Sequence, residues 1–96
     1  MNKLSLLSTL DVQVAFSQSI RDKRKALKLS RAALAERSTV PASTIKKFET
    51  TGQISLRQLL LLWQCVDDLR RLFAVTTQAP IAAGRAPTSI DEVLAL

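Results

Sequence analysis

The stretch LSRAALAERSTVPASTIKKFE, residues 29–49, decides the fold, because it is typical of two short helices joined by a tight turn. Its spaced apolar residues are those that two crossed helices bury against a third, namely Leu34, Val40, Ile45 and Phe48. Ser30 suits the N-cap of the first helix, and Pro41 suits the first position of the second. We therefore predict an all-α protein built around a helix-turn-helix unit.

The second helix of this unit is expected to carry small and cationic side chains on its exposed face: Ala42, Ser43, Thr44, Lys46 and Lys47. The net charge of the chain is +6, and residues 21–57 contribute ten basic and three acidic side chains to it. A cationic segment that coincides with an exposed helix is what binding to a phosphate backbone requires. DNA is the predicted partner, and a merely solvated basic face is the alternative.

Residues 16–66 resemble the helix-turn-helix of the Cro and lambda-repressor class, also called the XRE family. Within that class Phe48 and Glu49, followed by a polar loop and a leucine-rich helix, look most similar to HipB-type antitoxins. The resemblance implies a compact five-helix lambda-repressor-like domain that represses its own operon and binds a HipA-type Ser/Thr kinase toxin. The family usually has glycine in the turn, whereas this turn has Ser38, Thr39 and Val40, so a positive φ at Thr39 would be strained.

The resemblance also implies roles for individual side chains of the helix-turn-helix. It puts Ala42, Ser43 and Lys47 at base edges in the major groove, where a methyl group, a hydroxyl and an ammonium can each read a base. Arg31, Thr44 and Lys46 are expected at phosphates, which position the protein without reading sequence. Pro41 begins the helix at the same DNA surface.

The helix before this unit is predicted over residues 11–28, with Val12, Phe16, Ile20 and Leu27 as its apolar stripe. Arg24 falls on the same face, and an unpaired buried guanidinium would cost several kcal/mol. Glu49 is its expected partner, a pairing that the family resemblance also implies. In the alternative, Arg24 extends to solvent along its own aliphatic stem.

The helix after the unit, predicted over residues 56–69, has an apolar face wider than a small domain covers. Leu61 falls among polar positions and is expected to be exposed, which indicates contact with a twin subunit or with another protein. Trp63 has two interpretations: it fills the local core, or it anchors in a pocket of a partner.

The predicted organisation has an N-terminal extension over residues 1–10, the DNA-binding domain over 11–75 and a flexible tail over 76–96. A fifth helix is expected from Asp67 or Asp68 to Val75. Within the tail, Ser89 and Glu92 match a capping box for a short helix over 89–96. That segment either frays or becomes ordered on a partner.

The residue inventory excludes several classes of site. With no histidine, no tyrosine and one cysteine, a metal cluster, a disulfide framework and His-assisted catalysis are not expected, and neither enzyme activity nor a cofactor is predicted. The opening MNKLSLLSTL is too short an apolar run for a signal peptide, and no later run could span a bilayer. We expect a bacterial cytoplasmic protein associated with the nucleoid and without a membrane partner.

The predicted function is therefore a homodimeric repressor that binds a two-fold double-stranded DNA operator, within a toxin-antitoxin operon of the HipB type. One alternative is a stand-alone repressor, either phage-type or housekeeping. The other is a protein-interaction adaptor in which DNA binding is secondary.

Overall fold

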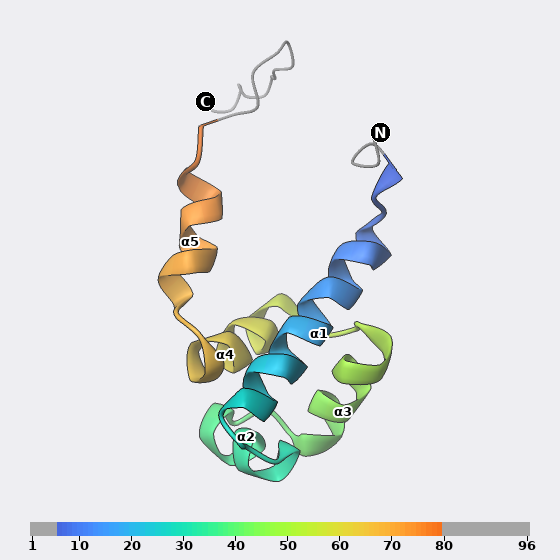
Figure 1. Ribbon diagram of the computed structural model, residues 1–96, viewed down its shortest axis with the longest axis vertical. Helices are drawn as coiled ribbons and strands as arrows, with labels where there is room; N and C mark the ends of the chain where they lie inside the picture. Colours follow the sequence, from blue (N-terminus) through green and yellow to red (C-terminus); the bar gives the residue numbers. More distant parts are fainter. Residues whose placement is uncertain (1–5, 80–96) are drawn as a thin grey trace.

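The computed structural model describes residues 6–79, and within them it contains five helices and no strand (Figure 1). The helices are α1 (Thr9–Ala26), α2 (Arg31–Ser38), α3 (Ala42–Thr51), α4 (Leu56–Val66) and α5 (Leu69–Thr77). The predicted all-α class is therefore correct. None of the helices in the described part of the chain is long and apolar enough to cross a membrane.

The boundaries of α1 differ by two residues at each end from the predicted range 11–28. The helix begins at Thr9 because Ser8 and Asp11 form a capping box, in which each side chain accepts a 3.0 Å hydrogen bond from the other residue's backbone N–H. It ends at Ala26 because Lys28 has a φ of 60°, outside the right-handed helical region.

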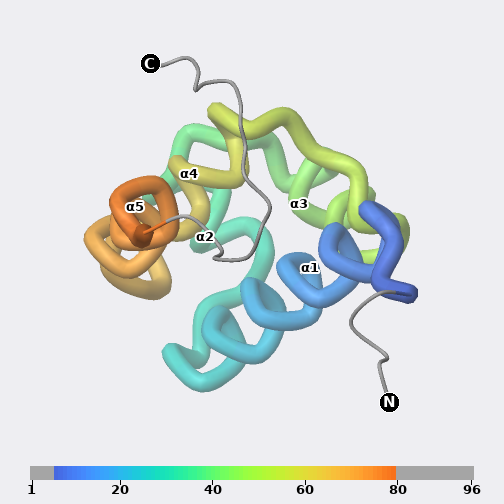
Figure 2. The backbone as a smooth tube through the Cα atoms, turned by 90° about the horizontal axis from the view of Figure 1, so that it is seen from above, coloured from blue at the N-terminus to red at the C-terminus, as the bar shows by residue number. Residues whose placement is uncertain are grey.

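The core lies where α1, α2, α3 and α4 meet, as the view along the bundle shows (Figure 2). Its fully buried side chains include Ile20 from α1, Leu62 from α4, and the apolar residues predicted from the helix-turn-helix: Leu34, Val40, Ile45 and Phe48. The predicted stripe on α1 was partly wrong. Phe16 packs against the core, but Val12 and Leu27 are about half exposed. Val12 lies in the N-terminal half of α1, which rises past α3 and α4 in Figure 1, and Leu27 is the C-cap residue after the last turn.

The turn between α2 and α3 is short and tightly bonded. Ser30 caps α2 by accepting from the Ala33 N–H at 3.0 Å, as expected. Thr39 has a φ of 67°, so this glycine-free turn does adopt the left-handed conformation that is strained for a β-branched residue. Pro41 is the N-cap of α3 and not its first helical residue, since its ψ of 144° is extended.

Gly52 ends α3 and brings it close to α1. Its φ is 82°, and a Cβ added there would lie 3.3 Å from backbone and side-chain carbons of Gln13. The Gln13 side-chain amide donates to the Gly52 carbonyl at 3.4 Å. Glycine is therefore required here both by its backbone conformation and by the close approach of α1.

The boundary between the predicted fourth and fifth helices differs from the observed one: α4 ends three residues before the predicted Leu69, and α5 begins at Leu69, not at Asp67 or Asp68. Because Asp67 is extended, α4 ends at Val66, and Asp68 then caps α5 by accepting from the Arg70 N–H at 2.9 Å. α5 continues to Thr77, two residues beyond the predicted end at Val75. The predicted short helix over 89–96 lies outside the described residues, as does most of the predicted tail.

Candidate nucleic-acid interface

The exposed face of α3 carries the side chains that the sequence singled out. Ala42, Ser43, Lys46 and Lys47 are exposed, and Thr44 is half-buried. The opposite face of the helix is fixed in the core by Ile45 and Phe48, whose exposed fractions are 0% and 1%. These two anchors leave α3 little freedom to rotate, so the exposed set faces outward as one surface.

Lys46 and Lys47 keep their charges available at this surface. Neither lysine forms a salt bridge within residues 6–79. At the end of the helix, the Thr51 hydroxyl donates to the Lys47 carbonyl at 2.7 Å, and the Thr50 hydroxyl donates to the Lys46 carbonyl at 3.0 Å. The backbone carbonyls of both lysines therefore accept hydrogen bonds, while their ammonium groups can bind an anion.

Arg24 and Glu49 form the ion pair that the sequence predicted. Arg24 Nε lies 2.8 Å from Glu49 Oε2, and Arg24 Nη2 lies 3.0 Å from Oε1, a bidentate contact that joins α1 to α3. A further guanidinium nitrogen, Nη1, donates to the Leu29 carbonyl at 2.8 Å. The Arg24 side chain is 8% exposed and the Glu49 side chain 1%, so the pair belongs to the scaffold beneath the surface.

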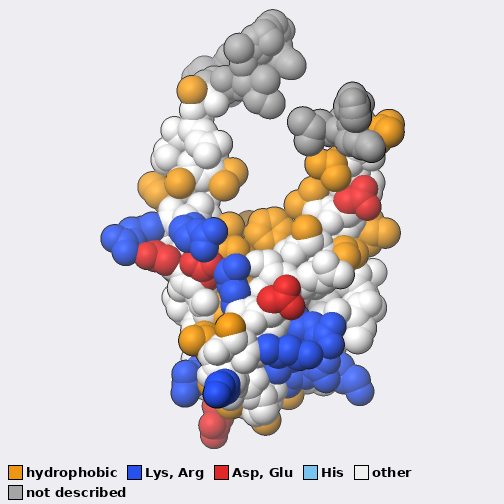
Figure 3. All heavy atoms as spheres, in the orientation of Figure 1, with side chains coloured by type: hydrophobic (Ala, Val, Ile, Leu, Met, Phe, Trp, Pro, Cys, Tyr) orange, Lys and Arg blue, Asp and Glu red, His pale blue; other side chains and the backbone are white. Residues whose placement is uncertain are grey.

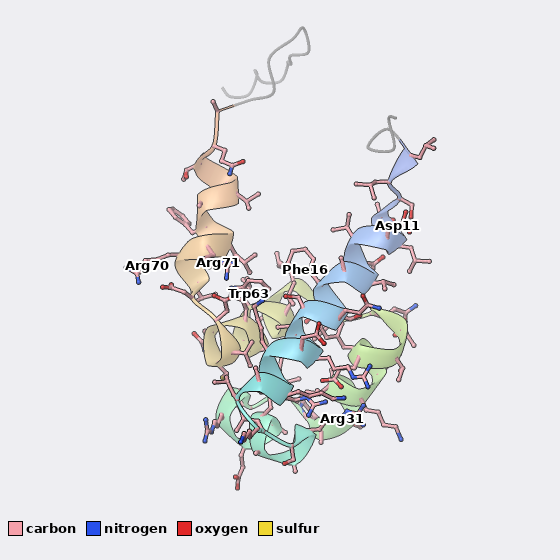
Figure 4. The ribbon with its side chains drawn as sticks, in the orientation of Figure 1. Asp11, Phe16, Arg31, Trp63, Arg70 and Arg71 are labelled. Atoms are coloured by element: carbon pink, nitrogen blue, oxygen red, sulfur yellow. The ribbon has the colours of Figure 1, made fainter. Side chains whose placement is uncertain are left out.

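Arg31 binds the same carboxylate, which the sequence analysis did not foresee. Its Nε donates to Glu49 Oε1 at 3.0 Å, while its side chain remains 37% exposed at the start of α2 (Figure 4). Glu49 thus neutralises one of two arginines, and the net charge left at the surface is positive. The predicted phosphate contact of Arg31 is compatible with this arrangement only through its other guanidinium nitrogens.

The two arginines determine the protonation state of Glu49. Burial raises the pKa of this carboxyl, but the hydrogen bonds and charges of Arg24 and Arg31 outweigh burial, and the pKa lies below its ordinary value of 4.5. Glu49 is consequently ionised at neutral pH and holds both guanidinium groups in place.

Basic side chains gather around the helix-turn-helix, at the end of the molecule opposite the chain termini (Figure 3). In addition to Lys46 and Lys47, exposed basic residues lie on α1 and just after it (Arg21, Lys25 and Lys28), on α2 (Arg37) and on α4 (Arg57). Positive charge around an exposed helix is the electrostatic footprint of a surface that binds a polyanion.

The structure places the Trp63 side chain in the core. Its side chain is 6% exposed, and its Nε1 donates to the Asp68 carbonyl at 3.0 Å. Phe16 meets its ring edge-on with a centroid distance of 5.9 Å, and Lys23 Nζ lies 5.4 Å from its centroid. Of the two interpretations of Trp63, the structure therefore agrees with the one in which it fills the local core.

Leu61 was also misjudged from the sequence. It is half-buried and packs against the core, because α4 contacts both α1 and α2 and so buries a wider arc than a single stripe. Elsewhere in the described chain, no group of histidine, cysteine or acidic residues is arranged to hold a metal ion.

Comparison with known proteins finds no family model, no curated protein and no solved structure that matches this chain.

Proposed function

We propose that this protein is a sequence-specific DNA-binding regulator of the Cro and lambda-repressor class, with α2 and α3 as its helix-turn-helix. The observation that carries the proposal is the exposed face of α3, which combines Ser43 with Lys46 and Lys47, while Ile45 and Phe48 hold the other face in the core. Within residues 6–79 neither lysine forms a salt bridge. A helix mounted in this way can enter a major groove about 12 Å wide.

The exposed side chains divide into two roles under this proposal. Ala42, Ser43 and Lys47 read base edges, and Lys46, Thr44 and Arg31 contact phosphates. One short helix reads few bases, so specificity needs two copies on a two-fold operator and a contribution from DNA shape.

The test begins with selection of a binding site from a pool of random duplexes, followed by titrations on the selected site and on scrambled DNA. Lys47→Ala should weaken the selected site about 5- to 100-fold and scrambled DNA far less. Lys46→Ala should weaken both, and it should reduce the slope of log affinity against log salt by about one. Equal losses for both variants on both duplexes would contradict the division of roles, and absence of any selected site would contradict the proposal itself.

The narrower proposal is a HipB-like antitoxin that autoregulates a toxin-antitoxin operon in the bacterial cytoplasm and has no catalytic activity of its own. Its support is the sequence resemblance at Phe48 and Glu49 and in the leucine-rich helix that follows. Expression together with the neighbouring genes, followed by purification, tests it. Stoichiometric recovery of a HipA-like kinase supports the antitoxin, whereas recovery of this chain alone favours a stand-alone repressor.

A further inference from the structure

An apolar groove of about 490 Å³ lies between α4 and α5, on the side of the molecule away from α3 (Figures 1 and 2). Every residue that lines it is apolar except Thr76. Leu60 in this lining is half-buried, whereas Leu56 and Phe73 are 71% and 66% exposed. An exposed apolar groove of this size is typical of a surface that binds another group. We call this feature the α4–α5 groove.

A smaller apolar hollow, of about 280 Å³, shares one lining residue with the groove, namely Phe16. Leu7, Val12 and Trp63 also line the hollow. Figure 1 shows that α1 and α5 rise from the bundle on the same side and diverge, and in Figure 3 hydrophobic side chains face the space between them. The groove and the hollow therefore form one open apolar surface between α1 and α5.

The chain leaves α5 beside this groove. Val75 and Thr76, in the last turn of α5, line the groove, and the helix ends at Thr77. Ser89 is ten residues after Ala79, the last described residue, and ten extended residues span at most about 33–36 Å. Since the nine residues of α5 make a helix only about 13 Å long, the segment that begins at Ser89 can reach any part of the groove.

Residues 89–96, with the sequence SIDEVLAL, have the pattern that an apolar groove requires of its occupant. On a helix that starts at the capping box of Ser89 and Glu92, the residues Ile90, Val93 and Leu94 share one face, at the spacing i, i+3 and i+4. The two acidic residues of the segment fall on the other side. A helix of eight residues is unstable alone in water, so this pattern indicates a segment that packs against an apolar surface.

We propose that residues 89–96 dock in the α4–α5 groove of their own chain as a short amphipathic helix. Ile90 and Val93, at the centre of the apolar face, pack against Leu60 and Phe73, and the acidic side of the helix faces solvent. The docking does not depend on DNA binding. It leaves α3 open, because α3 lies on the other side of α1 from the groove (Figure 1).

The covalent connection favours this segment over any separate molecule. A short flexible tether holds the segment beside the groove at an effective concentration on the order of millimolar, which a free protein does not reach. Charge acts in the same direction, since the segment has two acidic and no basic residues, whereas basic residues outnumber acidic ones in the described part of the chain. Another molecule that binds the groove must therefore first displace residues 89–96.

Paramagnetic NMR of the full chain, without DNA, tests the docking. A nitroxide is attached at Asp91→Cys, on the solvent side of the proposed helix, and Cys65→Ser removes the natural thiol. We expect the amide signals of Leu60 and Phe73 to lose about half of their intensity or more, because the tether keeps the segment docked for most of the time. The amide of Lys47 on α3 should keep its intensity.

Two further substitutions in the labelled chain show whether the apolar face is responsible. Val93→Glu puts a charge on that face and should restore the intensities of Leu60 and Phe73, because a carboxylate cannot be buried there without a partner. Ala95→Glu is the matched control, since it adds the same charge to the polar side of the same segment and should leave the loss unchanged. The positions of the other amide signals report that both variants keep the fold.

A mixture of nitroxide-labelled chain without ¹⁵N and unlabelled chain with ¹⁵N distinguishes the segment of the same chain from that of a second copy. We expect no loss of intensity in the mixture. An equal loss there would place the segment in the groove of another copy and overturn the proposal. Absence of any loss in the labelled chain itself would also overturn it, and so would a loss that persists in Val93→Glu. Because DNA is absent throughout, failure of the proposed regulator would leave these results unchanged.

Discussion

Arg24 on α1 and Glu49 on α3 form a bidentate ion pair, with Nε 2.8 Å from Oε2 and Nη2 3.0 Å from Oε1. The pair lies directly beneath the exposed face of α3, and both side chains are almost completely buried. Because two parallel hydrogen bonds fix direction as well as distance, the pair sets the angle at which α3 is mounted on α1.

Removal of either partner alone should therefore destabilise the protein strongly. We expect Glu49→Leu to lower the free energy of unfolding by about 3–5 kcal/mol, since it leaves the buried Arg24 charge without a carboxylate. Arg24→Met should cost less, because Glu49 keeps its hydrogen bond to Arg31. The double variant should recover part of this loss, because no buried unpaired charge remains: Arg31, which also loses Glu49, is 37% exposed. Urea unfolding measures all three, with the exposed Arg57→Met as control. Strict additivity of the two single losses would show that the pair is not coupled.

Acid should weaken the contact between Glu49 on α3 and Arg24 on α1. The pKa of Glu49 is lower in the folded protein than its ordinary value of 4.5, so the folded state favours the ionised carboxylate. This stability is fully present above the unfolded pKa of about 4.5 and is lost as the pH falls through the lower folded pKa. Thermal unfolding between about pH 6 and pH 2 should show a fall in Tm that is smaller in Glu49→Gln. An identical pH dependence in the variant would assign the acid sensitivity to other carboxylates.

Trp63 should behave as a core residue. Trp63→Ala should cost about 3–5 kcal/mol of stability through the cavity it leaves between α1 and α4. Trp63→Phe should cost less, because it retains the ring but removes the donor to the Asp68 carbonyl. Thermal unfolding with helix content as the signal measures both. A stable Trp63→Ala protein with wild-type helix content would mean that the indole does not support the core.

Replacement of Thr39 by glycine should stabilise the protein. A β-branched residue at a φ of 67° is strained by about 1–2 kcal/mol, whereas glycine adopts this conformation freely. After the greater chain entropy of glycine is subtracted, we expect Thr39→Gly to stabilise the protein by about 0.5–1 kcal/mol. Glu36→Gly, at an exposed helical position on α2, should instead destabilise by about 1 kcal/mol. A loss of stability in Thr39→Gly would show that its side chain contributes more than its strain costs.

The two short helices α2 and α3 and the turn between them could be predicted closely from the sequence, because the residues that determine them are local. The spacing of Leu34, Ile45 and Phe48 specifies the buried faces, and the hydroxyl of Ser30 specifies a helix start. The Arg24 pairing was also predicted, since a guanidinium on an apolar stripe needs a carboxylate, and Glu49, at the end of the second helix of the unit, was its expected partner.

The predictions that failed depend on where separate elements meet. Leu61 was expected to be exposed from its place on a helical wheel, but α4 contacts both α1 and α2, and a wheel of one helix does not include its neighbours. Val12 fits the stripe of α1 by spacing, yet the helix extends past the bundle at that point. Arg31 was assigned to phosphate alone, because no local pattern shows that Glu49, eighteen residues later, reaches it.

The attachment of α5 has a consequence for how this protein can diversify. α5 packs chiefly on α4, and its junction is held by a few polar contacts around Asp67. A helix with so few anchors can open locally at a lower free energy than the four-helix core. It can also accept new residues on its outer face without disturbing the packing under α3. Selection, or a designer, could therefore change the surface that α5 presents while the exposed face of α3 stays the same.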